Sequence, residues 1–354
     1  MVLSSRRRTE GLSKKPKAID LFSGCGGLTL GLRQAGFSVI GAIEADAVAA
    51  HTYRQNHRNS RLWQADIESV SPAQMRKILK LKVGELDLLA GCPPCQGFSS
   101  LRTRNGAQRN RDLRNGLVSQ MVRFARVLRP KFIMMENVPN LASREPFRQL
   151  CRDLKRIGYR VEYAVKDASR YGVPQRRKRL ILLASIDSAI VFAPEEAEFL
   201  TVRDAIGTIP SAGSGADPLH DMPEFPRSTR INELIRDIPK DGGSRRDLPA
   251  KRQLDCHRKT TGFSDIYGRM AWDQVAPTIT TGCFNPSKGR FLHPEEDRAI
   301  TMREAALLQG FPATYKFDPR LGKIAIAKMI GNALPPEFIR RHAILIRSAL
   351  QLAD

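Results

Sequence analysis

A short apolar run that leads into a glycine-rich turn and then into a helical segment constrains the fold of this chain most. Residues 18–22 are expected to form a strand, and the turn Ser-Gly-Cys-Gly-Gly at residues 23–27 follows it directly. Residues 28–34 are expected to form a helix that ends at Gly36, and residues 39–43 form the next predicted strand. A strand, a glycine turn and a helix open the nucleotide-binding half of a doubly wound sheet. The sequence therefore predicts an α/β, Rossmann-like doubly wound fold.

An acidic residue follows the second predicted strand. Glu44 stands twenty residues after Gly24, where a carboxylate suits the two hydroxyl groups of a ribose. The glycines let the backbone approach such a ligand closely. The spacing is not Gly-x-Gly-x-x-Gly, so a nicotinamide cofactor is not the preferred ligand. Asp66, near the end of a third predicted strand, has two interpretations: it meets an adenine amino group, or it caps the following turn.

The buried strand predicted at residues 86–90 ends abruptly. Pro93 and Pro94 have no N–H to continue a ladder, so the chain must turn out of the sheet there. The turn delivers Cys95 to the carboxyl end of a strand, where open α/β sheets place their ligands. A thiol on a stiff turn is a candidate nucleophile, and the alternative is a buried structural cysteine.

A second predicted strand end repeats this arrangement. Residues 131–135 form an apolar run that leads to Glu136 and a proline turn. A carboxylate at this place can give or hold a proton, and its alternative role is to cap the next helix. Further on, Gln175, Arg177 and Arg179 alternate ahead of another apolar run. Alternate residues of a strand share a face, so the three side chains are expected to point together toward an anionic or carbonyl-bearing ligand.

Positive charge dominates the composition. The 354 residues include 58 Lys and Arg against 36 Asp and Glu, and the net charge of +22 points to a polyanionic partner such as nucleic acid. Residues 101–117 carry five arginines, with Arg102 and Arg104 among them, and one acid. This segment is interpreted either as a lid that contacts phosphates or as a solvated loop.

Hydropathy and cysteine spacing narrow the setting in which the chain is expected to act. No run of about eighteen apolar residues and no secretory signal occurs, so no membrane association is expected. The six cysteines form neither a disulfide framework nor a metal-ligand pattern. A reducing, cytoplasmic location and a site without metal are therefore expected.

The alternation of predicted strands and helices divides the chain. Residues 1–17 are expected to be a basic, disordered arm, and residues 18–185 to form the catalytic and cofactor-binding domain. Over residues 186–294 prolines and glycines are frequent and the alternation stops, so a smaller, irregular second domain is expected. Residues 295–354 are expected to return to the first domain.

Six separate motifs, taken in order, resemble those of the DNA (cytosine-5) methyltransferase family. They extend from residue 20 to residue 336, and chance does not readily produce six such matches in order. The motifs are Asp-Leu-Phe-Ser-Gly-Cys-Gly-Gly at 20–27, Gly-Cys-Pro-Pro-Cys-Gln-Gly-Phe-Ser at 91–99, Glu-Asn-Val at 136–138, Gln-Arg-Arg-Lys-Arg at 175–179, Arg-Glu-Ala-Ala-Leu-Leu-Gln-Gly-Phe-Pro at 303–312 and Gly-Asn-Ala-Leu-Pro-Pro at 331–336.

The resemblance implies S-adenosylmethionine as the methyl donor and a cytosine flipped out of double-stranded DNA as the acceptor. It implies Cys95 as the nucleophile that adds to ring carbon 6, Glu136 as the group that holds the base edge, and Arg177 and Arg179 as donors to the cytosine. The residues implied around the donor are Phe22, Gly24, Gly26, Gly27, Glu44, Ala45, Asp66, Ile67, Pro93, Asn332 and Ala333, and those implied at the DNA are Gln96, Ser99, Arg102, Arg104 and Gln175.

The chain departs from the family pattern at two places. Cys92 creates a Cys-Pro-Pro-Cys sequence that the motif does not require, and Ala45 follows Glu44 where a large side chain usually stands. The resemblance further implies that residues 186–294 are a target-recognition domain and that the enzyme is a monomer. A restriction endonuclease that cuts the same site is the partner it suggests, as in restriction-modification systems.

Three alternatives stay open from the sequence. The first is a tRNA cytosine-5 methyltransferase of the same fold, although the insert at 186–294 favours duplex DNA because a sequence reader needs such a domain. The second is a thiol oxidoreductase built on Cys92 and Cys95, which leaves the glycine turn and Glu136 without a role. The third is a catalytically silent DNA-binding module, against which the intact Cys95 and Glu136 argue.

Overall fold

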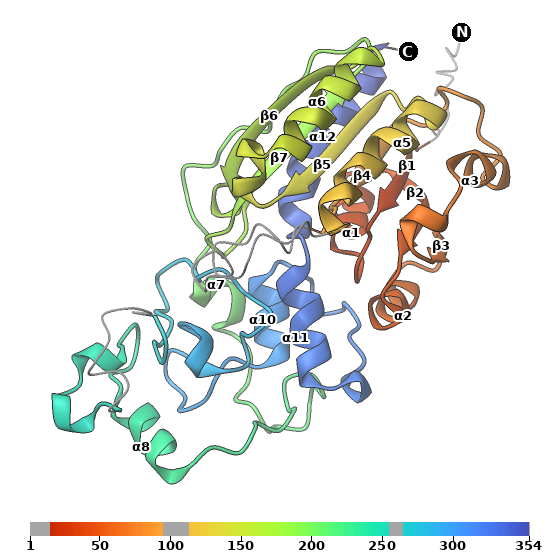
Figure 1. Ribbon diagram of the computed structural model, residues 1–354. Coiled ribbons are helices and arrows are strands. Elements are labelled where there is room, and N and C mark those ends of the chain that lie inside the picture. The colour runs from red at the N-terminus through yellow and green to blue at the C-terminus, as the bar shows by residue number, and fades with distance from the viewer. Residues whose placement is uncertain (1–14, 95–112, 255–264, 354) are drawn as a thin grey trace, which may run out of the picture.

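The computed structural model describes residues 15–94, 113–254 and 265–353, which form two lobes (Figure 1). The larger lobe is built on a seven-stranded sheet of strand order β3-β2-β1-β4-β5-β7-β6. Its strands are β1 (Lys17–Leu21), β2 (Ser38–Glu44), β3 (Arg61–Gln64), β4 (Leu88–Gly91), β5 (Phe132–Asn137), β6 (Arg160–Asp167) and β7 (Lys178–Ser185). The doubly wound α/β class predicted from the glycine turn is confirmed.

The sheet is parallel except at β7, the last strand in the sequence, which lies between β5 and β6. The pairs β1–β2, β1–β4, β2–β3 and β4–β5 are parallel, whereas β7 runs antiparallel between β5 and β6. Central parallel strands are covered on both faces and therefore need apolar side chains in both directions. β4 and β5 meet this demand, since every residue in each is buried. The carboxyl ends of β1, β2, β4 and β5 consequently lie along one edge of the sheet.

Helices cover both faces of the sheet (Figure 1). The helices of this lobe are α1 (Gly27–Gln34), α2 (Ala47–Asn56), α3 (Pro72–Ile78), α5 (Ser119–Leu128), α6 (Glu145–Arg156) and α12 (Pro336–Ala353). Neighbouring strand residues point to opposite faces, so β1 gives Ala18 to a core shared with α1 and α12 and gives Ile19 to a core shared with α3, α5 and α6. The sheet is thus the middle layer of three.

The smaller lobe consists of short helices and long connections, and its core also takes in Cys25 and Ala49 of the larger lobe. Its helices are α7 (Val202–Ile206), α8 (Thr229–Asp237), α10 (Met302–Leu308) and α11 (Lys323–Asn332). The apolar side chains of α10 and α11 share one core with Trp272 and Phe291, so these two helices pack within the smaller lobe. The chain was expected to rejoin the sheet domain from residue 295, but in the described structure α12 is the helix that packs back on the sheet.

Local signals set where several elements begin. A capping box starts α10: the Glu304 N–H donates to Thr301 Oγ1 at 3.2 Å, and the Thr301 N–H donates to Glu304 Oε2 at 2.7 Å. At the start of β1 the Lys17 N–H donates to Asp87 Oδ2 at 2.7 Å. Lys17 is therefore part of the sheet rather than of the expected arm, and residues 1–14 lie outside the described residues.

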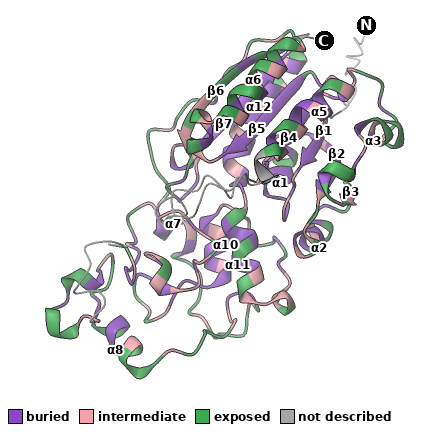
Figure 2. Ribbon diagram, viewed as in Figure 1, coloured by how far each residue is buried: buried purple, intermediate pink, exposed green. Residues whose placement is uncertain are grey.

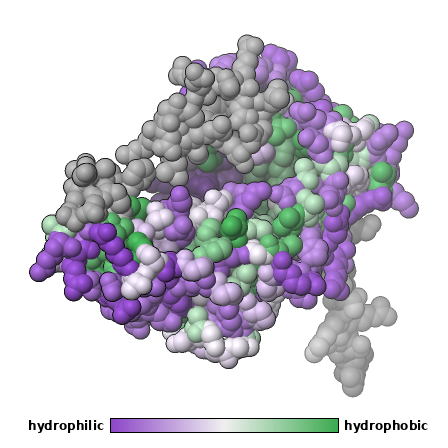
Figure 3. Space-filling model, turned by 60° about the horizontal axis from the view of Figure 1, so that its bottom comes forward, coloured by the Kyte–Doolittle hydropathy of each residue, from purple (hydrophilic) through white to green (hydrophobic). Residues whose placement is uncertain are grey.

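Burial follows this layering. Buried residues fill the central strands and the sheet-facing sides of the helices (Figure 2). Hydrophilic residues cover most of the face shown in Figure 3, with a smaller group of apolar residues toward its middle. Among the helices of the described residues, none is both long and apolar enough to cross a membrane.

Candidate active site

A buried ion pair joins β5 and β7 at the edge of the sheet where the carboxyl ends of the parallel strands lie. Glu136 is the residue before the last in β5, and its side chain is almost fully buried. The Nε atom of Arg179, from β7, lies 2.7 Å from Glu136 Oε1. Glu136 is opposite Ile181 in the antiparallel ladder, which brings Arg179 alongside it. The arginine therefore fixes the direction of the carboxylate and places a positive charge against it.

The strand beside β5 leads to the predicted nucleophile. Gly91 is opposite Met135 in the parallel ladder, so Cys92 comes next to Glu136, and the Cys92 thiol is hydrogen-bonded to that carboxylate. Burial, reinforced by the negative charge of Glu136, raises the pKa of the Cys92 thiol well above its ordinary value. A thiol in this state is a poor nucleophile and a poor redox partner.

The turn after β4 is held from the neighbouring strand. The Asn137 Nδ2 atom donates to the Pro93 carbonyl oxygen at 3.0 Å, and both residues are buried. The description of the chain stops at Pro94. Five predicted residues lie outside the described residues: Cys95, Gln96, Ser99, Arg102 and Arg104. What the structure does show is that the segment leading to Cys95 ends beside the buried Glu136.

A second carboxylate closes the glycine turn after β1. The Gly24 N–H donates to Glu44 Oε2 at 2.7 Å, and the Asp46 N–H donates to Glu44 Oε1 at the same distance. Burial raises the pKa of Glu44, although these two hydrogen bonds oppose the rise. Phe22 precedes the turn with φ of 63°, a left-handed conformation that is uncommon outside glycine. The turn is therefore fixed from both sides.

The glycines of this turn serve two different purposes. At Gly24, whose φ is 55°, a Cβ would meet no atom within 4 Å, so the backbone there faces open space beside Glu44. At Gly26 a Cβ would lie 2.3 Å from His57 Nε2, and at Gly27 it would lie 2.5 Å from the Leu334 carbonyl oxygen. All three glycines were expected at the cofactor; in the structure Gly26 and Gly27 also let other protein groups pack closely, and their contact with a cofactor stays a prediction.

The open space at Gly24 fits a ribose-bearing cofactor. It lies at the carboxyl ends of β1 and β2, next to a carboxylate whose two oxygens are already aimed by backbone N–H groups. A carboxylate oxygen has more than one acceptor position, so Glu44 can still accept from ribose hydroxyl groups. The residues present therefore fit the ribose of a cofactor, with Glu44 as the acceptor.

The other residues expected at the cofactor take different positions. Asp66 is exposed and caps a short 3₁₀ turn, because its Oδ1 accepts from the Glu68 N–H at 2.9 Å, and Ile67 is buried in the sheet core. Both interpretations of Asp66 therefore stand, since the cap uses one oxygen. Ala45 and Asn332 are exposed, and Ala333 is half-buried.

Two residues expected to contact the substrate are interior. Gln175 is fully buried, and Arg177 is 3% exposed. Both precede β7, which begins at Lys178. The alternation expected from the sequence is present: Arg176 and Lys178 are exposed, and Arg179 is half-buried on the same side as Gln175 and Arg177. Gln175 and Arg177 hydrogen-bond to protein groups on the smaller lobe and around α11, whereas Arg179 turns to Glu136. The contacts expected of Gln175 with DNA and of Arg177 with the base therefore stay predictions, without geometric support here.

A polar network under the glycine turn was not anticipated from the sequence. Thr29 Oγ1 donates to Asp20 Oδ2 at 2.6 Å and lies 3.0 Å from the Tyr53 hydroxyl. Burial raises the pKa of Asp20 to about 7. Asp20 is a polar residue inside the apolar run of β1, and that was the available signal in the sequence. The network braces α1 and α2 against β1.

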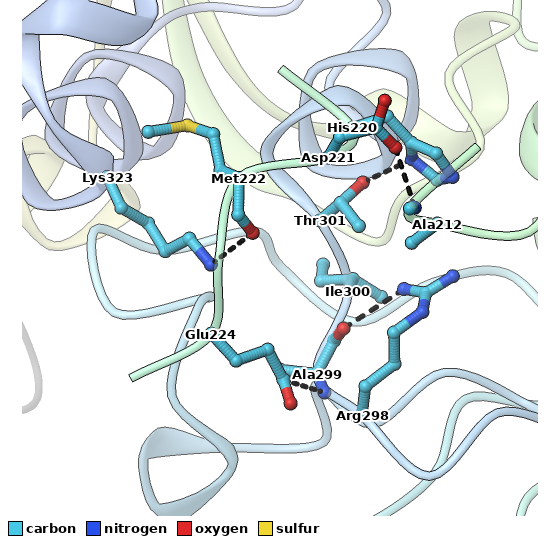
Figure 4. A pocket seen from close by; sticks show the side chains of 11 residues that line it. Ala212, His220, Asp221, Met222, Glu224, Arg298, Ala299, Ile300, Thr301 and Lys323 are labelled. Atoms are coloured by element: carbon cyan, nitrogen blue, oxygen red, sulfur yellow. Dashed lines mark hydrogen bonds between the residues drawn. The ribbon is translucent and has the colours of Figure 1, made fainter. Parts of the chain in front are cut away.

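A pocket of about 200 Å³ lies in the smaller lobe, away from the strand ends (Figure 4). Its polar groups already bond to each other: Lys323 Nζ donates to the Met222 carbonyl oxygen at 3.2 Å, and Glu224 Oε1 accepts from the Ala299 N–H at 3.0 Å. These contacts join the segment around residue 222 to α11 and to the strand-like segment before α10. Among the described residues no group of three His, Cys, Asp or Glu side chains is gathered to hold a metal ion.

Comparisons with known proteins agree with this geometry. The family model described as C-5 cytosine-specific DNA methylase matches residues 16–346. A Type II methylase from Herpetosiphon aurantiacus, M.HgiDII, is 37% identical over 94% of this chain and 95% of its own length. The Type II methyltransferase M1.HphI from Haemophilus parahaemolyticus is 33% identical over 90% of this chain and 83% of its own.

Solved structures share the fold. A DNA modification methyltransferase encoded within an E. coli prophage matches with a TM-score of 0.74 at 24% identity, over 95% of this chain and all of that chain. The S. pombe Dnmt2 methyltransferase matches with a TM-score of 0.60 at 17% identity, over 96% of this chain and all of that one. At these identities the likeness concerns the fold.

Proposed function

The chain belongs to the C-5 cytosine-specific DNA methylases, and from this premise we propose that it methylates carbon 5 of a cytosine in duplex DNA by a covalent route through Cys95. The observation that carries the proposal is the buried Glu136 carboxylate. It is held by Arg179 at 2.7 Å and lies one strand away from the segment that leads to Cys95. Methylation of carbon 5 by a covalent route needs both a nucleophile and a carboxylate that holds the base.

The open space at Gly24 is the proposed place of S-adenosylmethionine, which supplies the methyl group when bound. Glu44 accepts hydrogen bonds from the ribose hydroxyl groups, and its own direction is set by the N–H groups of Gly24 and Asp46. Phe22 and Pro93 border the same edge of the sheet, at the ends of β1 and β4. These residues bind and orient, and none of them takes part in a bond change.

Cys95 and Glu136 divide the work on the base. Carbon 5 of cytosine is a weak nucleophile until the Cys95 thiolate adds to carbon 6, which forms a C–S bond and moves the electron pair of the 5,6 double bond toward carbon 5. Glu136 holds the ring nitrogen edge and shares a proton with it, so the charge that the addition creates is neutralised. After methylation carbon 5 loses its proton to a base, the C–S bond breaks, and Cys95 leaves as a thiolate.

Access to the base requires that it leave the duplex, since neither face of carbon 6 can be reached inside the stack. We assign the grip on the DNA to the smaller lobe and to the arginine-rich segment 101–117, supported by the net charge of +22. The relatives are Type II methylases, so a restriction endonuclease of the same specificity and a cytoplasmic place of action belong to this proposal.

A mechanism-based trap tests the proposal. Duplex DNA from plasmids treated with the enzyme is first sequenced after bisulfite conversion, which gives the target site. A duplex with 5-fluorocytosine at that site cannot lose its substituent at carbon 5, so the protein should remain attached through Cys95 and migrate as an adduct in denaturing gels. The same sequence as RNA is the control for the alternative substrate. Methyl transfer without any trapped adduct would exclude the covalent route.

A further inference from the structure

The Arg177 side chain is buried, and its guanidinium group donates four hydrogen bonds to other protein groups. Nη1 donates to the Ile279 carbonyl oxygen at 3.0 Å and to Gln175 Oε1 at 3.5 Å. Nη2 donates to the carbonyl oxygens of Gly331 at 2.9 Å and Ala333 at 3.1 Å. Arg177 therefore joins the segment before β7 to the smaller lobe, at Ile279, and to the end of α11.

The position of the guanidinium at α11 is electrostatically favourable. Gly331 and Ala333 lie at the C-terminal end of this helix, where carbonyl groups lack helical partners and the helix dipole is negative. Burial lowers the pKa of the Arg177 guanidinium, so its charge is costly there without partners. The carbonyl oxygens of α11 and Ile279 offset that cost.

A second side chain supports the same carbonyl group. The buried Gln309 donates through Nε2 to the Ala333 carbonyl oxygen, and its Oε1 accepts from Gln175 Nε2 at 2.7 Å. Gln175 in turn accepts from the Ile279 N–H at 2.9 Å. The Ala333 carbonyl oxygen thus accepts from both Arg177 and Gln309, and Gln175 links these two side chains to each other.

The clamped backbone lies against both parts of the proposed site. A Cβ at Gly27 would lie 3.5 Å from Ala333 Cβ and 2.5 Å from the Leu334 carbonyl oxygen, so this backbone packs on the glycine turn. A Cβ at Gly331 would lie 2.3 Å from backbone atoms of Thr280 and Thr281, so the smaller lobe packs on the other side. Exposed Asn332 stands between the two.

We propose that Arg177 and Gln309 are positioning residues, which hold the backbone at residues 331–333 in the shape that the methyl donor requires and tie it to the backbone at Ile279 and to the segment before β7. Arg177 then acts through Ala333 and not by touching the cytosine. The inference rests on the proposed function, because it assumes that the donor binds beside Gly24. It predicts that removing the hydrogen bonds of Arg177 to residues 331 and 333 weakens binding of the methyl donor even when no DNA is present.

The test is the affinity for S-adenosylhomocysteine without DNA, measured by calorimetry on the full chain. Arg177→Lys keeps the charge but cannot reach Ile279 and both α11 carbonyls together. A hydrogen bond to a charged group accounts for enough free energy that the dissociation constant should rise at least about tenfold. Gln309→Met removes one neutral donor to Ala333 and should weaken binding less. The matched control is Arg179→Lys, which should leave donor affinity unchanged and reduce turnover.

The outcomes separate the inference from the function on which it rests. If Arg177→Lys binds S-adenosylhomocysteine like the wild type and loses only turnover with DNA, Arg177 acts on the base and the inference is overturned. If Arg177→Lys does not fold, as judged by circular dichroism, Gln309→Met decides, and wild-type affinity in that variant overturns the inference. If the wild type itself fails to bind S-adenosylhomocysteine, the proposed function falls together with the inference.

Discussion

Two glycines that stand two residues apart should lose stability to very different extents on the same substitution. Gly24→Ala places a methyl group in open space, with no atom within 4 Å, at φ of 55°. An L-residue in the left-handed region costs about 1–2 kcal/mol. The reduced freedom of the unfolded chain returns about 0.4–1 kcal/mol. The free energy of unfolding should therefore fall by only about 1 kcal/mol.

Gly26→Ala meets a filled environment. The new methyl group would lie 2.3 Å from His57 Nε2 and 2.7 Å from the Tyr315 hydroxyl, at φ of 102°. Overpacking costs about 1–3 kcal/mol. Moving His57 also disrupts its contacts with the Gly26 carbonyl oxygen at 3.1 Å and with Tyr315 at 2.9 Å, and each such buried loss costs about 1–3 kcal/mol. With the backbone strain added, the loss should reach at least about 4 kcal/mol.

Donor binding should follow a different order from stability. The methyl group of Gly24→Ala enters the space beside Glu44, so the affinity for S-adenosylhomocysteine should fall at least about tenfold in a protein that remains folded. Urea unfolding followed by circular dichroism gives the stabilities, and calorimetry gives the affinities. Wild-type affinity in Gly24→Ala would show that the donor lies elsewhere. Wild-type stability in Gly26→Ala would show that the packing of His57 on the turn is misjudged.

Three further predictions concern the carboxylate, the two thiols and the buried histidines. Glu136→Gln should retain donor and duplex binding but lose at least about a hundredfold in turnover, as measured by tritiated methyl transfer, because general acid–base groups contribute about that much; full turnover would contradict its role. Cys95→Ser should abolish turnover while still binding duplex DNA by anisotropy, whereas Cys92→Ala should keep most activity; equal losses would argue against a single nucleophile. Burial lowers the pKa values of His57 and His342 to about 4, so the unfolded chain takes up protons below its own pKa of 6.5 that the folded chain refuses. Compared with His342→Phe, the wild type should lose unfolding free energy as the pH falls from 6.5 toward 4, and parallel pH profiles would refute this.

The sequence predicted the elements of the larger lobe because its signals are local. The apolar runs before Glu44 and Glu136 are the strands β2 and β5, and the capping box at residues 301–304 that starts α10 is a local signal of the same kind. A capping signal needs only four neighbouring residues. The carboxyl-end placement of Glu136 followed from the same reasoning, because parallel strands bring their ends to one edge.

What the sequence did not predict depends on contacts between distant segments. Gly26 and Gly27 read as ligand glycines, since nothing near them in the sequence announces His57 or Leu334. Gln175 was expected to point toward a ligand together with Arg177 and Arg179, but nothing near it in the sequence indicates that its Oε1 accepts from the distant Ile279 N–H. The surroundings of α10 and α11 depend on such contacts as well, since these helices share one core with Trp272 and with Cys25 of the glycine turn.

The two thiols of Cys-Pro-Pro-Cys show how the fold decides between readings that the sequence left open. A disulfide exchange pair needs an accessible thiol with a lowered pKa. Cys92 has the opposite properties: β4 ends beside β5, its thiol is hydrogen-bonded to Glu136, and burial raises its pKa well above the ordinary value. Because that carboxylate is also held by Arg179, the thiol belongs to the support of Glu136. Cys92 is therefore a poor candidate for the redox pair, and the proposal that Cys95 is the single nucleophile does not depend on it.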